Sequence, residues 1–254
     1  MKVSIITVTF NCISVINDCL ESIKAQEYKD IEHIVVDGAS TDKTLSLLNA
    51  KRDQIQVLIS EKDKGIYDAM NKGINLAKGD IIGFLNSDDI YASNNVLSKV
   101  ASLFNNNPML DACYADLVYT NKFDTSKNIR YWKSNKFIPG SFSKGWCPPH
   151  PTFFVRRAVY ERLGIFNLNY SISADVELMM RFIEVNKINI CYVPEVWVKM
   201  RMGGLSNSNF KNIFKQNLEV LNALNKHDRP KNFFMFFIYK FFSRLKQFFK
   251  TSEK

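Results

Sequence analysis

Cysteine is scarce in this sequence, and its arrangement excludes a disulfide framework. The 254 residues contain five cysteines, an odd number, scattered without the close spacing of a zinc or redox motif. Structural disulfides are therefore not expected. Buried free thiols in a reducing cytoplasm are the simplest interpretation of these residues.

Long apolar runs are also absent. No stretch approaches the roughly twenty apolar residues that a membrane-spanning helix needs. The first apolar run, Val3–Phe10, follows a single cation, Lys2, and has the length and β-branched composition of a buried strand, so no signal peptide is predicted. These observations predict a cytoplasmic protein without a transmembrane segment.

Positive charge is unevenly distributed along the chain. The formal net charge is +9, but residues 226–254 hold eight cationic and two anionic side chains, a net +6, which leaves +3 for everything before them. A protein that binds nucleic acid more often spreads its positive charge over one folded face. The pattern argues against a nucleic-acid partner and indicates a nearly neutral globule followed by a basic segment.

The first ninety residues alternate between short apolar runs and helical patterns. This alternation predicts an α/β fold with a mostly parallel, Rossmann-like sheet flanked by helices. The predicted strands are 3–10, 32–37, 56–60 and 80–85, and the predicted helices are 14–25, 43–50 and 67–77. The second half is less regular, with predicted strands at 112–120 and 151–155, a helix at 175–185, and a hairpin or mobile loop at 121–143. A compositional break near Asn225–Arg229 divides the chain into a main domain, 1–225, and a tail, 226–254.

Polar clusters terminate the first four predicted strands. They are Asn11, Asp37, the segment Glu61–Gly65 and the segment Asn86–Asp89. Because parallel strands bring their carboxyl ends to one edge, a single polar site is expected there. A carboxylate at a strand end can accept a hydrogen bond from a base or ribose, and two consecutive carboxylates can hold Mg²⁺ or Mn²⁺. Turn formation or helix capping is the alternative interpretation of each residue.

Several ordered motifs resemble the donor-binding half of family 2 glycosyltransferases with the GT-A fold. They are TVTFN at 7–11, VDGASTD at 36–42, DKGIYDAMNKG at 63–73 and LNSDD at 85–89, followed by PHPTFF at 149–154, SADVEL at 173–178 and GGLS at 203–206. The resemblance covers roughly residues 3–208. It implies an enzyme that transfers a sugar from a nucleotide-sugar donor, with a UDP-sugar as the first expectation.

The resemblance also assigns roles to individual positions. It places a group of side chains around the donor: Thr9, Asn11, Asp37, Asp63, Lys64, Asp68, Asn71, Asp88, His150 and Arg201. Asp89 is the expected direct ligand of the divalent cation, with Asp88 beside it, although Asn86 stands where the family usually has a third acidic residue. Asp175 matches the catalytic base, which would accept a proton from the acceptor hydroxyl and so give inversion at the anomeric carbon. A helix-capping role for Asp175 is the alternative.

The tail predicts an amphipathic helix. Eight of the twenty phenylalanines lie between Phe233 and Phe249, interleaved with Lys240, Arg244 and Lys246. Such a helix is typical of a segment that lies on an anionic membrane surface, and packing on the domain or on a second subunit is the alternative. A peripheral location on the inner face of the cell membrane would give access to a lipid-linked saccharide acceptor.

The sequence therefore favours an inverting, metal-dependent glycosyltransferase of bacterial surface-polysaccharide assembly. One alternative is a sugar nucleotidyltransferase, but the residues after the first strand, Asn11–Ile13, lack the glycine-rich basic loop typical of that class. A catalytically silent partner of a working transferase is the other. Retention of Asp37, Asp88, Asp89 and Asp175 together argues against it.

Overall fold

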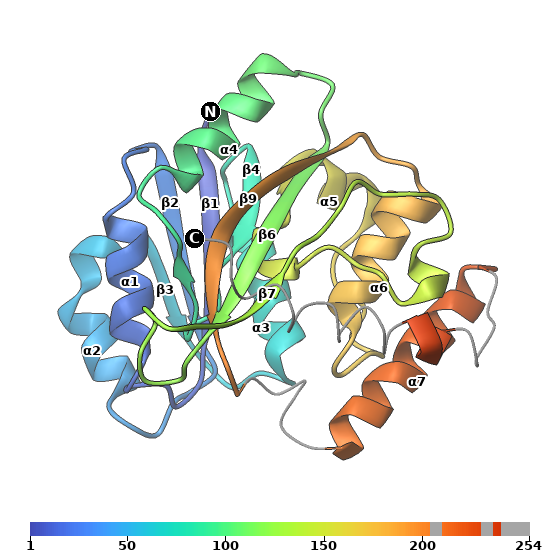
Figure 1. The fold of residues 1–254 in the computed structure, drawn as a ribbon. Helices are drawn as coiled ribbons and strands as arrows, with labels where there is room; N and C mark the ends of the chain where they lie inside the picture. Colours follow the sequence, from blue (N-terminus) through green and yellow to red (C-terminus); the bar gives the residue numbers. More distant parts are fainter. Residues whose placement is uncertain (204–209, 230–235, 240–254) are drawn as a thin grey trace.

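The computed structural model describes residues 1–203, 210–229 and 236–239 (Figure 1). In its first half, β1 (Val3–Thr9) is buried along its whole length and pairs in parallel with β2 (Ile31–Asp37) and β4 (Ile81–Phe84). On the far side of β2 lies β3 (Val57–Ser60), also parallel. Strands covered on both faces need apolar side chains at most positions, which explains the short β-branched runs. The predicted parallel unit is confirmed, with order β3-β2-β1-β4.

The helices between these strands cover opposite faces of the sheet. α1 (Ile16–Lys24) buries Cys19 and Leu20 in one hydrophobic cluster, whereas α3 (Ile66–Leu76) buries Met70 in the other. α2 (Thr44–Ala50) begins one residue later than predicted. All three predicted helices are confirmed to within two residues at each end.

The second half extends the sheet with strands of both directions. It contains β5 (Ile90–Tyr91), β6 (Ala112–Thr120), β7 (Asn128–Trp132), β8 (Phe154–Arg156) and β9 (Ile190–Arg201). The sheet order is β3-β2-β1-β4-β8-β6-β9-β5, with β7 paired to β6. β8 runs antiparallel to both β4 and β6, while β6 and β9 are parallel. The sheet is mixed and mostly parallel in its first half, as predicted.

For the second half, the structure corrects one prediction, refines another and confirms one alternative of a third. The segment 151–155 is expected to be one strand, but a 3₁₀ turn at His150–Thr152 precedes β8. The Thr152 hydroxyl stabilises this turn, because its proton is shared between the carbonyls of Pro149, directly before the turn, and Ala115 of β6. The single helix expected at 175–185 is α6 (Ala174–Met180) followed by a π-helical turn at Arg181–Val185. The segment 121–143 contains a hairpin, since β7 pairs antiparallel with β6.

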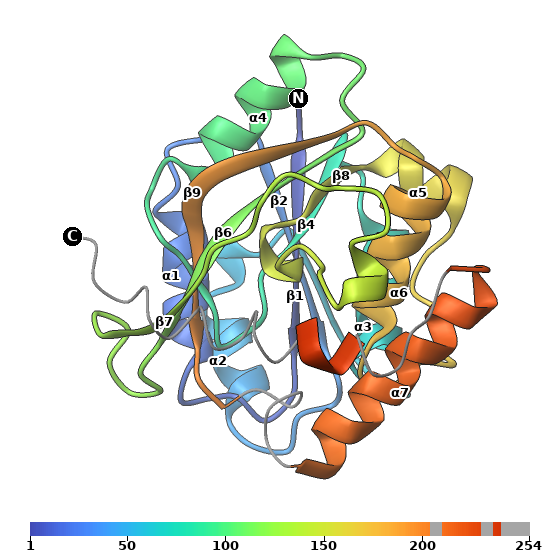
Figure 2. The ribbon, with the colours of Figure 1, turned by 45° about the vertical axis from the view of Figure 1, so that its right-hand side comes forward.

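Further helices complete the two layers. α4 (Val96–Asn106) contributes to the same hydrophobic cluster as α1, and α5 (Arg157–Leu163), α6 and α7 (Phe210–Lys226) lie together on the opposite side (Figure 2). No helix among the described residues is long and apolar enough to cross a membrane.

Most of the predicted amphipathic tail lies outside the described residues, at 230–235 and 240–254. The helical turn at 236–239 packs on the protein itself, with Phe236 fully buried in the hydrophobic cluster. The proposed boundary at residue 225 falls one residue before the end of α7. It stays a prediction.

Candidate active site

The carboxyl ends of β1, β2 and β3 place three polar side chains in one row. Thr9 is the register partner of Asp37, and Asp37 is the register partner of Ser60. Thr9 Oγ1 donates to Asp37 Oδ1 at 3.0 Å, and Ser60 Oγ donates to Asp37 Oδ2 at 2.6 Å. The amide and the hydroxyl of Ser40 add two more hydrogen bonds to the same carboxylate. Asp37 therefore joins the ends of three strands to the turn that follows β2.

These hydrogen bonds decide the charge of Asp37. Burial alone would raise the pKa of this carboxyl group, but the hydrogen bonds from Ser40, Ser60 and Thr9 outweigh burial and lower the pKa. A fixed carboxylate at a strand end suits recognition of a nucleoside. All four donors come from the protein, however, so direct contact between Asp37 or Thr9 and a nucleoside stays a prediction.

Asn11 ties the end of β1 to the turn after β2. Its side-chain oxygen accepts hydrogen bonds from the backbone N–H groups of Thr41 at 2.8 Å and Asp42 at 3.3 Å. Its backbone φ of 48° lies in the left-handed region, which asparagine tolerates better than most residues. These contacts fit the turn-forming interpretation of Asn11, and a donor contact stays a prediction.

The loop between β3 and α3 brings more charge to the same edge. Asp63 Oδ1 accepts from the Gly65 amide at 2.8 Å, and Asp68 Oδ2 accepts from the Lys64 amide at 3.0 Å, while Lys64 itself is exposed. Asp63 Oδ2 lies only 2.5 Å from where a Cβ on Gly38 would stand. Glycine at 38 thus permits the close approach of Asp63 to the end of β2.

Two of the predicted donor residues are engaged with the protein. Asn71 exchanges two hydrogen bonds, both 2.9 Å, with the backbone of Phe166, so its amide fastens α3 to the segment before α6. The guanidinium of Arg201 donates to Asp18, to the Lys122 carbonyl and, at 2.9 Å, to the Asp88 carbonyl. Arg201 thus supports the backbone of the aspartate pair. Contact of Asn71 or Arg201 with the donor stays a prediction, and the loop residues Gly204–Ser206 lie outside the described residues.

The aspartate pair follows β4. Asp89 is fully buried and Asp88 is partly exposed. Burial raises the pKa of both carboxyl groups, and the charge of Asp88 raises that of Asp89 further, whereas the cation of Arg201 lowers that of Asp88. Adjacent carboxylates in this setting are costly to ionise without a counter-cation.

The oxygens around this pair fit a divalent cation in part. Asn86 Nδ2 donates to Asp89 Oδ2 at 3.1 Å, while Asp89 Oδ1 and Asn86 Oδ1 are buried without a hydrogen-bond partner among the described residues. Carboxylate and amide oxygens are ligands of Mg²⁺ and Mn²⁺. The part of the chain described by the structure holds no group of three or more His, Cys, Asp or Glu that could bind a metal. Oxygens from a bound phosphate would have to complete the shell.

The predicted base faces a cavity of about 500 Å³ next to the strand ends. Asn86, His150 and Asp175 all line it. The Tyr67 hydroxyl lies 2.8 Å from both Asp175 Oδ1 and the Ile172 carbonyl oxygen, and its single proton is shared between these two acceptors. Burial, followed by the charge of Asp175, raises the pKa of Tyr67 well above its usual value, so Tyr67 remains a neutral donor. Asp175 lies in the first turn of α6, which also suits its capping interpretation.

His150 is a neutral imidazole in this cavity. Its ring packs against Phe84 and Phe166, with centroid separations of 5.2 and 5.7 Å. Burial lowers the pKa of His150, although the charge of Asp175 partly opposes this effect. His150 and Asp175 thus line the same cavity, and the donor contact of His150 and the catalytic role of Asp175 stay predictions.

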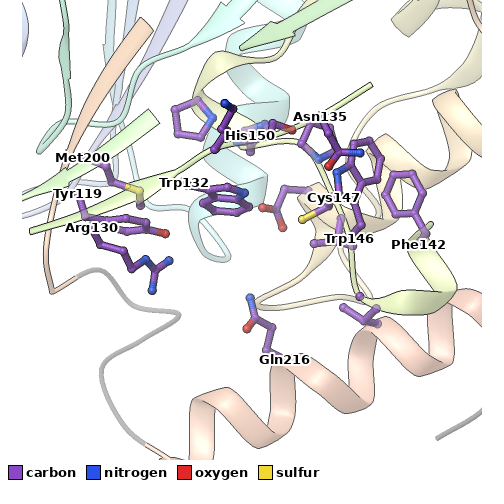
Figure 3. A pocket seen from close by; sticks show the side chains of 18 of the residues that line it. Tyr119, Arg130, Trp132, Asn135, Phe142, Trp146, Cys147, His150, Met200 and Gln216 are labelled. Atoms are coloured by element: carbon purple, nitrogen blue, oxygen red, sulfur yellow. The ribbon is translucent and has the colours of Figure 1, made fainter. Parts of the chain in front are cut away.

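Other lining residues of the cavity are aromatic, and sequence reasoning missed them. Trp132 of β7 stacks parallel to Tyr119 of β6, with 3° between the rings and 6.3 Å between the centroids, and Arg130 lies over the Tyr119 ring. In Figure 3, Trp132 lies between Tyr119 and Arg130 on one side and Trp146 on the other. Gln216 of α7 points toward Trp132. The segment 121–143 contributes Arg130 and Trp132, so its aromatic content is the signal that could have pointed to part of this wall.

Several buried polar atoms of the cavity residues lack a partner among the described residues. They are Asn86 Oδ1, Ser134 Oγ, Trp146 Nε1 and Gln216 Oε1. Flat aromatic surface combined with unpaired donors and acceptors suits a ligand that is apolar on its ring faces and hydroxylated at its edges. A sugar has this chemistry.

Sequence comparisons match this chain to glycosyltransferases. The profile described as "Glycosyl transferase family 2" matches residues 4–164. The "PGL/p-HBAD biosynthesis glycosyltransferase Rv2957" of Mycobacterium tuberculosis is 32% identical over 209 residues, which are 81% of this chain and 79% of that protein. The E. coli "UDP-Glc:alpha-D-GlcNAc-diphosphoundecaprenol beta-1,3-glucosyltransferase WfaP" is 26% identical over 224 residues, covering 84% of this chain and 83% of WfaP.

Solved structures share the fold at low sequence identity. Residues 1–349 of Staphylococcus aureus TarS, in complex with UDP-GlcNAc, align with a TM-score of 0.66 at 17% identity over 91% of this chain and 68% of that one. A longer TarS chain is covered for only 44% of its length. The mannosyltransferase PcManGT of Pyrobaculum calidifontis, in complex with GDP-Man and Mn²⁺, aligns with a TM-score of 0.66 at 18% identity over 91% of this chain and 65% of that one.

The expected GT-A fold and the expected glycosyltransferase resemblance are thus confirmed, by the sheet together with its structural neighbours and by the sequence relatives. The chain belongs to glycosyl transferase family 2.

Proposed function

We propose that this glycosyltransferase moves a sugar from a UDP-sugar donor to a lipid-linked saccharide, with inversion and with the help of Mg²⁺ or Mn²⁺. The observation that carries the proposal is the arrangement of Asp175 and Asn86. Asp175 faces the same cavity as Asn86, and Asn86 is hydrogen-bonded to Asp89 at the end of β4. A candidate base and a candidate diphosphate site therefore adjoin one cavity.

In this proposal the cavity binds the acceptor and the strand ends bind the donor. The acceptor sugar would rest against Trp132 and present one hydroxyl to Asp175. Asp175 would take the hydroxyl proton at Oδ2, since Tyr67 donates to Oδ1. The acceptor oxygen would then form a bond to the anomeric carbon while the bond from that carbon to the diphosphate breaks on the opposite face. A single displacement of this kind inverts the anomeric centre.

The leaving nucleoside diphosphate carries the developing charge. Asp88 and Asp89, with Asn86, would hold the divalent cation, which neutralises negative charge on a diphosphate when bound. Burial of His150 keeps its imidazole uncharged, so His150 can orient a hydroxyl or phosphate without adding charge. The names of two similar proteins support the donor class, because WfaP is named for UDP-Glc and TarS was solved with UDP-GlcNAc.

The acceptor proposal rests on the aromatic cavity and on one relative. WfaP is named for a diphosphoundecaprenol-linked GlcNAc acceptor. A peripheral position at the inner face of the membrane would bring such an acceptor within reach. We place the membrane contact in the basic part of the tail, because the turn at 236–239 is packed on the protein.

The test is turnover of an Asp175→Asn variant. UDP-glucose or UDP-N-acetylglucosamine with Mn²⁺ and a synthetic undecaprenyl-diphosphate-linked GlcNAc would be the first donor and acceptor probes. The variant should lose about 10²–10⁴-fold in kcat, the usual contribution of a general base, while UDP still binds. Asp53→Asn is the matched control, because Asp53 is exposed in a turn before β3, at the edge opposite the site. Wild-type turnover of Asp175→Asn would remove Asp175 as the base.

A further inference from the structure

Glu219, midway along α7, accepts hydrogen bonds from the segment that leads into α6. Its Oε1 accepts hydrogen bonds from the amide and hydroxyl of Ser171, at 3.1 and 2.8 Å. Its Oε2 accepts from the amides of Ile172 and Ser173, both at 2.9 Å. One carboxylate thus accepts hydrogen bonds from three consecutive backbone N–H groups directly before α6, the last of them that of its N-cap residue, Ser173.

The segment bound by Glu219, Ser171–Ser173, leads directly to the proposed base. Ser173 is the last residue before α6, and Asp175 lies in the first turn of that helix. The single hydroxyl proton of Tyr67 is shared between the Ile172 carbonyl and Asp175 Oδ1. Any shift of this segment therefore changes both the backbone under Asp175 and the hydrogen bond that orients its carboxylate.

The carboxylate of Glu219 is held in its charged form by these contacts. Burial alone would raise the pKa of Glu219, but the hydrogen bonds from Ile172, Ser171 and Ser173 lower the pKa on balance. α7 is also tied to α6 further along, where His227, just after α7, lies 2.8 Å from the buried Glu177 of α6. Hydrogen bonds of Glu219 and His227 thus connect α7 and the residue after it to α6 and the segment before it. The two helices lie side by side in Figures 1 and 2.

We infer that Glu219 is a positioning residue for catalysis, acting through Ser171–Ser173 on Asp175 and Tyr67. The inference rests on the proposed role of Asp175. No strand end contacts Glu219 among its hydrogen bonds, so its effect should fall on turnover and leave donor binding unchanged. Misplacement of a reacting group by about 1 Å can cost on the order of 10²-fold in rate.

The experiment compares Glu219→Gln with Glu195→Gln, a half-exposed glutamate of β9 that pairs with Lys99. Glutamine keeps the shape of Glu219 but replaces one oxygen with a donor that faces backbone N–H groups. We expect kcat to fall about 10–100-fold with the donor KM within twofold of wild type, and Glu195→Gln to match wild type. In an Asp175→Asn background, Glu219→Gln should cause no further loss.

The outcomes separate this inference from the proposed function. An active Asp175→Asn variant would overturn the proposed function and this inference with it. An inactive Asp175→Asn together with full turnover of Glu219→Gln would overturn this inference alone, as would equal losses in kcat and donor affinity. If Glu219→Gln does not fold, Ser171→Ala decides, because it removes only the hydroxyl hydrogen bond. A fall in its kcat at constant donor KM supports the inference, and unchanged kcat overturns it.

Discussion

Replacing Asp37 with asparagine should destabilise the protein measurably, because Asp37 accepts two hydrogen bonds at each oxygen. An asparagine keeps only one oxygen. Its amide nitrogen will take the place of Oδ1, where both donors are the hydroxyls of Thr9 and Ser40, since hydroxyls can rotate and accept. The remaining oxygen will keep its bonds from the Ser40 amide and the Ser60 hydroxyl.

The magnitude follows from the loss of charge. Hydrogen bonds to a charged group contribute about 1.5–3 kcal/mol each, against about 1 kcal/mol for neutral ones. Four bonds that lose their charge assistance, two of them also reversed, give a destabilisation of about 3 kcal/mol. Ser60→Ala removes a single donor to this charged carboxylate and, because Ser60 is exposed, should cost about 1.5 kcal/mol, which provides a graded comparison.

Urea unfolding at neutral pH, followed by circular dichroism, measures both effects. The midpoint should fall in the order wild type, Ser60→Ala, Asp37→Asn, with the slope m unchanged. A midpoint for Asp37→Asn that corresponds to less than about 0.5 kcal/mol of destabilisation would refute the reasoning, because the carboxylate would then not be joining the three strand ends.

Two further predictions concern the sheet interior and the tail. Burial lowers the pKa of His33 from 6.5 to about 4, so the unfolded chain takes up a proton in a pH range where the folded protein does not. The contribution of His33 to the free energy of unfolding is therefore fully present above pH 6.5 and should fall by about 3 kcal/mol as the pH decreases to 4. In urea unfolding at a series of pH values, His33→Gln should remove this part of the acid dependence. A free energy of unfolding that varies with pH as in the wild type would contradict the prediction. Changing Lys240, Arg244, Lys246 and Lys250 to glutamine leaves Phe236 in place and should abolish sedimentation with phosphatidylglycerol vesicles. Undiminished sedimentation would mean that the basic tail is not the membrane contact.

The first half of the fold was predictable because its strands are buried on both faces and its helices have one apolar face. β9 could not be predicted in the same way, because Pro194 and Glu195 interrupt its apolar pattern. Its pairing with β6 skips over these two residues: Ala115 pairs with Val193 and the next residue, Asp116, with Val196. Proline lacks the N–H that a regular ladder needs and is tolerated at such an irregularity.

The types of residue at the site were predictable, but their partners were not. Asn71 and Phe166 are separated by 95 positions, and Arg201 and Asp18 by 183. Only the folded structure shows that the Asn71 side chain is hydrogen-bonded to the backbone of Phe166 and that the Arg201 guanidinium donates to the Asp88 carbonyl. Glu219 carried no motif at all, because its role depends on how α7 packs against the segment before α6.

The central claim, a metal-assisted nucleotide-sugar site at the ends of β1, β2 and β4, is tested most directly by thermal denaturation with UDP, GDP, dTDP and CMP, each with and without Mn²⁺. The account predicts that UDP raises the melting temperature and that it does so only when Mn²⁺ is present. Folded protein whose melting temperature responds to none of the four nucleotides, with or without the metal, would contradict the account.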